Sequence, residues 1–157
     1  MIRDFFLIIF FYLLTLFQNS FLVHYFQNGN SVNLVLAFII IIAFLENKKS
    51  KTGLLAAISG GFFLDIFSPY FFGLFLLLTL IIILLIKFLK PFFDSDKLVS
   101  FIIIDSIIFL LYEIVIFLLN VHNGLYFIFL NFLFNFFSTL IVYCLMRLGY
   151  VFIQKKI

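Results

Sequence analysis

The chain has 157 residues, of which 66% are hydrophobic and only 11% are charged. A soluble domain carries roughly 25% charged residues, so this composition excludes an ordinary water-soluble domain and favours a protein embedded in a lipid bilayer. The net charge of +3 does not indicate nucleic-acid binding. Apolar spans of roughly 20 residues would use up most of the chain and leave no globular surface for a basic patch.

Six apolar runs predict an all-α membrane bundle of six transmembrane helices, which forms a single domain over residues 1–157. No small-residue cleavage pattern follows the first run, so we expect it to be retained rather than removed as a signal peptide. The second and third runs are short, which favours inner positions in the bundle. The expected spans are about 5–23, 32–45, 52–67, 71–89, 98–119 and 125–152.

All basic residues of the chain fall on one side of this six-span layout. Three connections, 26–31, 68–72 and 120–124, contain no Lys or Arg. The positive-inside rule therefore predicts that these three loops lie outside and that both termini are cytoplasmic. The ten basic residues are Arg3, Lys48, Lys49, Lys51, Lys87, Lys90, Lys97, Arg147, Lys155 and Lys156.

Small residues mark the third span. Gly53, Ala57 and Gly61 recur every four residues, and Gly60 stands beside them. Small side chains at this spacing let helix backbones approach one another closely. We therefore expect the third span to be a central, closely packed helix.

Three acidic residues lie within or at the edge of spans, where a charge at a helix centre costs roughly 2.5–3.5 kcal/mol on insertion scales. We expect Asp65 to accept hydrogen bonds from nearby backbone N–H groups or from Ser68 in the turn that follows it. Asp105 lies about one turn from the cytoplasmic end of its span, and we expect its carboxylate to reach the interface. The third acid, Glu113, lies deeper.

Glu113 has candidate partners in the next span. The loop 120–124 is short, so the fifth and sixth spans are expected to be antiparallel neighbours. This arrangement predicts a hydrogen bond from Glu113 to Asn131 or Asn135. Two interpretations stay open: a polar contact that holds the hairpin together, or a site for a partner or ligand. Gln18, at the outer end of the first span, belongs to the same outer group of polar residues.

Catalytic and metal-binding patterns are missing from the sequence. It contains no glycine-rich phosphate loop and no HExxH, and its single cysteine, Cys144, has no neighbouring ligands for a metal. His24 and His122 fall in or beside outer loops, where we expect them to be solvated. We therefore expect neither an enzyme nor a bound cofactor.

Several of these short motifs together resemble the MreD family, the small integral-membrane rod shape-determining proteins of bacteria. The likeness extends over nearly the whole chain, but the family usually has Pro before the second span, where this chain has Ser31-Val32. The matching stretches are 15–20; 33–36; 53–73, with Gly60-Gly61-x-x-x-Asp65 and Gly73 opening the next helix; and Glu113 with Asn135 and Arg147.

The resemblance implies a non-enzymatic scaffold of the cell-elongation machinery in the bacterial inner membrane. Such a protein would bind a single-span MreC-like protein and help couple MreB-like filaments to peptidoglycan synthases. The family's fold is similar to that of the substrate-binding subunits of energy-coupling-factor vitamin transporters, which supply the alternative function. Those subunits carry an Ala-rich motif on the first span, whereas residues 5–22 here contain neither Ala nor Gly, which favours the scaffold.

Overall fold

The computed structural model describes residues 2–22, 32–46, 50–93, 98–119 and 125–154, and these residues form helices joined by short turns, without β-strands. The helix bounds lie within three residues of the expected spans. The elements are α1 (Ile2–Phe17), continued by the π-helix η1 (Gln18–Leu22), α3 (Leu34–Leu45), α4 (Thr52–Phe67), α5 (Leu74–Leu89), followed by the 3-10 helix η2 (Lys90–Phe92), α6 (Leu98–Leu119) and α7 (Leu125–Gln154).

Some of the sequence expectations concern positions outside the described residues. These are the loops 26–31 and 120–124, both histidines, and Lys48, Lys49, Lys97, Lys155 and Lys156. The third expected outer loop, 68–72, is described, and it forms the turn between α4 and α5.

Four segments are long and apolar enough to cross a membrane by length and composition: Asp4–Phe21, Leu74–Phe92, Leu98–Leu119 and Phe129–Arg147. The two remaining helices are shorter, with 12 residues in α3 and 16 in α4. At 1.5 Å per residue they extend about 18 and 24 Å, less than the roughly 30 Å of a hydrocarbon core. The described residues are therefore those of an all-helical membrane protein, with four helices of spanning length and two shorter apolar ones.

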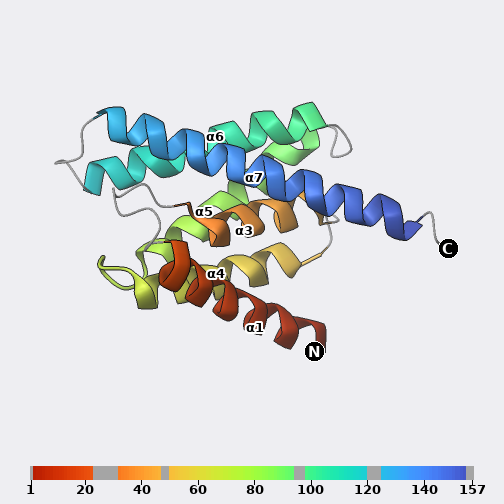
Figure 1. Cartoon of the computed structure of the whole chain (residues 1–157), viewed down its shortest axis with the longest axis horizontal. Coiled ribbons are helices and arrows are strands. Elements are labelled where there is room, and N and C mark those ends of the chain that lie inside the picture. The colour runs from red at the N-terminus through yellow and green to blue at the C-terminus, as the bar shows by residue number, and fades with distance from the viewer. Residues whose placement is uncertain (1, 23–31, 47–49, 94–97, 120–124, 155–157) are drawn as a thin grey trace.

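The helices form layers in which α3 is the most enclosed element. Figure 1 shows α6 and α7 on one side, α1 and α4 on the other, and α3 and α5 between them. The sequence of α3 is apolar all round, as expected of a helix that is surrounded by others. Eight of its twelve residues are buried. The short second span thus has the inner position that its length predicts.

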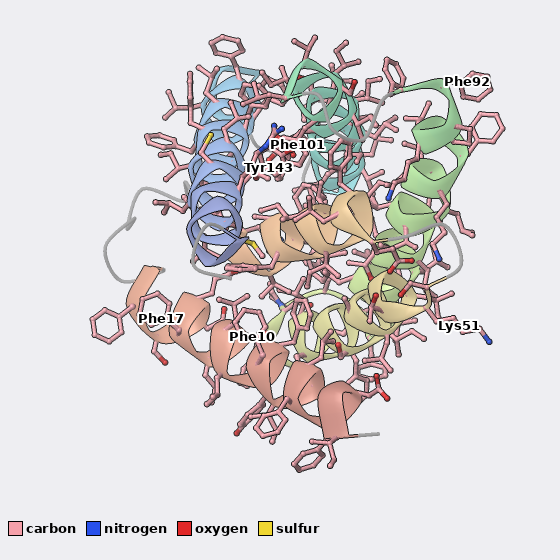
Figure 2. All side chains as sticks on the ribbon, turned by 90° about the vertical axis from the view of Figure 1, so that its right-hand side faces the viewer. Phe10, Phe17, Lys51, Phe92, Phe101 and Tyr143 are labelled. Atoms are coloured by element: carbon pink, nitrogen blue, oxygen red, sulfur yellow. The ribbon has the colours of Figure 1, made fainter. Side chains whose placement is uncertain are left out.

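Aromatic rings hold α3 against the α6–α7 pair. The rings of Phe101 and Tyr143 stack with centroids 3.8 Å apart, and Phe44 of α3 meets Phe101 edge-on at 5.1 Å. Figure 2 shows Phe101 and Tyr143 between their helices, whereas Phe17 and Phe92 point away from the bundle. Outward-facing apolar side chains of this kind are suited to contact with lipid rather than water.

Candidate functional site

Asp65 joins the end of α4 to the start of α5. Its side chain is only 3% exposed, and its two oxygens accept hydrogen bonds from the backbone N–H groups of Phe75 (2.8 Å) and Leu76 (3.0 Å). The first N–H groups of a helix have no partner within that helix, and a carboxylate also complements the positive end of the helix dipole. The expected backbone donors are thus present, and they belong to the next helix. Ser68 contributes through its backbone N–H, which donates to the Asp65 carbonyl oxygen at 3.3 Å.

The small residues of α4 lie where neighbouring helices approach most closely. A methyl group placed on Gly61 would lie 2.7 Å from Cα of Leu76, closer than any packed carbon can lie. The same replacement at Gly60 would bring the methyl group within 2.8 Å of Ile39 on α3. One turn earlier, the carbonyl oxygen of Ala57 accepts a hydrogen bond from the Thr79 hydroxyl at 3.0 Å.

Two further glycines act at the ends of helices. Gly73 precedes α5 with φ of 100°, a left-handed conformation that other residues adopt only with strain. Gly53, at the start of α4, donates its N–H to the carboxylate of Glu46, which also accepts from the Thr52 hydroxyl at 2.9 Å. Both glycines therefore help to set where a helix begins.

Glu46 organises the end of the bundle where α3 and α5 finish. Its carboxylate pairs with Lys87 Nζ at 3.2 Å, and its backbone carbonyl oxygen accepts from Lys90. Glu46 was not among the site residues expected from the sequence. An acidic residue in the short connection before a small-residue helix was the available signal, because carboxylates favour helix N-termini.

The predicted hydrogen bond between α6 and α7 is present, with Asn135 as the partner. Asn135 Nδ2 donates to Glu113 Oε1 at 3.2 Å, and these residues are only 2% and 5% exposed. Asn131 is also buried, but its side-chain oxygen has no hydrogen-bond partner within the described residues. Of the two amides considered for Glu113, the structure thus selects the one that lies a turn further along α7.

Asn33, which was not among the expected site residues, connects three helices, α3, α6 and α7. Its backbone N–H donates to Asn135 Oδ1 at 2.7 Å, and its side-chain nitrogen donates to the Tyr112 hydroxyl at 3.0 Å. Its side-chain oxygen caps α3 by accepting from Leu36 N–H at 3.0 Å. Gln18 adds a bond from the η1 segment by accepting from Val35 N–H at 3.1 Å. An Asn directly before an apolar run is a recognised helix-start signal and could have identified Asn33.

The expectation for Asp105 was wrong. Instead of reaching the interface, its side chain is fully buried, and neither carboxylate oxygen has a hydrogen-bond partner within the described residues. Asp105 lies on the α6 face that carries Phe101 and Phe109, both fully buried. Depth along a helix does not reveal which way a side chain faces, and here the carboxylate faces inward.

Two hollows flank Tyr112. One, of about 190 Å³, lies beside the turn 68–72 and is lined by polar residues such as Gln18, Asn19 and Asn33 together with apolar ones. The other, of about 330 Å³, is an apolar groove between α5 and α6. Among the described residues, no group of three or more His, Cys, Asp or Glu side chains could hold a metal ion.

Comparisons with protein-family models, with curated proteins and with solved structures give no match for this chain. The class of the protein therefore follows from its described helices, which define an all-helical membrane protein with a buried polar network that links α3, α6 and α7.

Proposed function

We propose that this protein is a non-enzymatic scaffold of the bacterial cell-elongation machinery. In this role it resides in the inner membrane with both termini in the cytoplasm and binds a single-span MreC-like protein. Through that partner it helps couple MreB-like filaments to peptidoglycan synthesis. The proposal starts from the sequence resemblance to the MreD family.

The observation that carries the proposal is that the polar residues shared with the MreD family make hydrogen bonds between helices. Asp65, Glu113 and Asn135 each make hydrogen bonds to a different helix within the bundle. Side chains whose hydrogen bonds are made inside the protein hold helices in fixed relative positions, and a rigid surface of helices is what a scaffold needs. A catalytic group would instead have to face a substrate.

The charged residues of the described region support the proposed orientation. Lys87 and Lys90 both contact Glu46 where α3 and α5 end, and Lys51 at the start of α4 is exposed (Figure 2). The turn 68–72 at the opposite end of α4 has no basic residue. Under the positive-inside rule, this asymmetry favours a cytoplasmic position for the Glu46 end.

The alternative function, a substrate-binding subunit of an energy-coupling-factor vitamin transporter, draws support from the outer polar hollow beside Tyr112. One feature favours the scaffold over it. The exposed side of α1 is bulky, with Phe5, Phe6 and Leu13 more than half exposed, and offers no small-residue surface for a coupling subunit.

Co-purification from native membranes tests the two functions against each other. We expect an MreC-like single-span protein to be retained with the wild-type chain. Asp65→Ala should lower the recovered complex, whereas Ile66→Ala, which changes an exposed neighbour, should not. Recovery of an ATPase module instead of an MreC-like protein would favour the transporter and overturn the scaffold.

Cysteine labelling tests the orientation separately. In a Cys144→Ser background, which removes the exposed native thiol, Pro69→Cys should react with an impermeant reagent in intact cells. Lys51→Cys should react only after the cells are permeabilised. The reverse pattern would invert the proposed topology.

A further inference from the structure

The outer polar hollow and the α5–α6 groove lie at the same level of the bundle and share a wall. Tyr112 lines both of them. Residues that are adjacent in sequence line different hollows. Leu74 and Val115 line the groove, whereas the next residues, Phe75 and Ile116, line the polar hollow. The two hollows therefore meet at Tyr112 and at the adjacent residue pairs 74–75 and 115–116.

The two hollows differ in chemistry. The groove is lined by apolar side chains such as Leu77, Leu78 and Ile81, together with Tyr112. The polar hollow is lined by amides and hydroxyls, including those of Gln18, Asn19 and Ser68, together with apolar residues, and none of its described lining residues is charged. The starts of α3 and α5 border the hollow, but their first N–H groups already donate to Gln18, Asn33 and Asp65. The uncharged lining therefore favours a ligand group that carries hydroxyls over a phosphate, because phosphate recognition relies on Arg, Lys or free N–H groups at helix N-termini.

The sizes also suit two parts of one molecule. The polar hollow, at about 190 Å³, exceeds the roughly 150 Å³ cavity that holds a six-membered benzene ring. The groove, at about 330 Å³, is open on the outside of the bundle, and Leu77 and Ile81 in it are more than half exposed. It can therefore accept a hydrocarbon chain directly from the bilayer.

We propose that these hollows form one binding site for an amphiphile with a small, uncharged, hydroxylated headgroup. The headgroup occupies the polar hollow, and a hydrocarbon chain lies in the groove between α5 and α6. The Tyr112 ring separates the two parts, and its hydroxyl, which is held by Asn33, faces the headgroup side. This site is independent of the scaffold proposal, which assigns no ligand.

Native mass spectrometry of the purified full-length chain tests the site with three probes: a monoglucosyl diacylglycerol, the diacylglycerol without a headgroup, and phosphatidylglycerol. We expect the glucosyl lipid to bind at least about tenfold more tightly than the other two, as one or two good hydrogen bonds would provide. Equal binding of all three lipids, or preference for phosphatidylglycerol, would overturn the proposal.

Substitutions in each half show whether the binding is specific. Ile81→Trp should fill the groove and weaken binding of the glucosyl lipid and the diacylglycerol alike. Ile58→Trp is the matched control, because Ile58 lies in a second outward-facing apolar hollow, lined by α1 and α4, that does not border the polar one. An equal effect of both Trp variants would indicate unspecific surface lipid and would contradict the site.

The proposed headgroup position is tested by the ratio of glucosyl-lipid binding to diacylglycerol binding, rather than by the total amount of lipid bound. Tyr112→Phe and Asn19→Leu should each reduce the advantage of the glucosyl lipid over diacylglycerol by about fivefold or more while leaving diacylglycerol binding unchanged. Asn19 is only partly buried, so its variant guards against loss of folding as the cause. If both variants keep the full preference for the glucosyl lipid, the headgroup does not bind in the polar hollow.

Discussion

The α4–α5 hairpin and the α6–α7 hairpin join neighbouring helices in different ways. In the first, Gly61 allows α5 to approach the backbone of α4, and both oxygens of Asp65 have hydrogen-bond donors. In the second, side chains make the contact, through the Glu113–Asn135 hydrogen bond. Between that bond and the Phe101–Tyr143 stack lies Asp105, which is buried without a partner in the described residues.

The difference teaches where this fold can change and where it cannot. Where two helix backbones are in close contact there is no space for a larger side chain, so any added atom must displace a whole helix. An interface between helices that is formed by side chains can repack, and it can contain polar groups that serve a purpose other than stability. We therefore expect α4–α5 to determine stability, whereas α6–α7 and the groove beside it are the better place for interactions with other molecules.

The largest effect is expected at the close approach of α4 and α5. Gly61→Leu would place side-chain atoms where Thr79 and Leu76 already lie, and we expect a loss of about 3 kcal/mol in the free energy of unfolding. Thermal unfolding of the protein in detergent measures this loss. The control, Ile58→Leu on the exposed side of the same helix, should change little. Equal melting temperatures for both variants would show that the helices are not in close contact there.

Removing the Asp65 carboxylate should cost somewhat less. Asp65→Ala leaves the N–H groups of Phe75 and Leu76 without their acceptors, and we expect a loss of about 2–3 kcal/mol. Asp65→Asn keeps one acceptor oxygen and should fall between Ala and wild type. The same unfolding assay ranks the three proteins. Normal stability of the Ala variant would contradict a stabilising role for the hydrogen bonds from α5 to the Asp65 carboxylate.

Asp105 should respond with the opposite sign. Leu has the same branching as Asp without the polar oxygens, so Asp105→Leu removes a buried group that has no described partner. We expect stability to rise by about 1–2 kcal/mol. A fall in stability would mean that Asp105 has a partner. Under the proposed scaffold function, a stabilised variant that fails to support rod shape would show that the carboxyl is retained for function.

The smallest effect is expected at the Glu113–Asn135 contact. Glu113→Gln keeps the shape and a hydrogen-bonding oxygen and should be tolerated, whereas Glu113→Leu should cost about 1 kcal/mol, typical of one polar contact between membrane helices. Membrane abundance and, as the readout of the proposed scaffold function, rescue of cell shape are measured for both. Loss of function by the Gln variant at normal abundance would show that a charged Glu113 serves a cation or a cationic ligand.

The positions of the helices were predictable from the sequence. Apolar runs of sufficient length become helices in a bilayer because backbone groups there must bond within their own segment, and turn residues mark where each run ends. The short loop 120–124 likewise predicted that α6 and α7 are neighbours, and from this followed the Glu113–Asn135 contact. The spacing of Gly53, Ala57 and Gly61 predicted the close packing around α4.

Only the tertiary structure decided which way individual polar side chains face. In a soluble helix, polar and apolar residues mark opposite faces, but a membrane helix is apolar on the lipid side as well as the protein side, so the periodic signal is lost. For this reason the inward direction of Asp105 and the donors to Asp65 on α5 could not be derived from spacing. The same holds for the links that Asn33 makes to Tyr112 and Asn135, since these residues lie 79 and 102 positions away and meet only when α3 packs against α6 and α7.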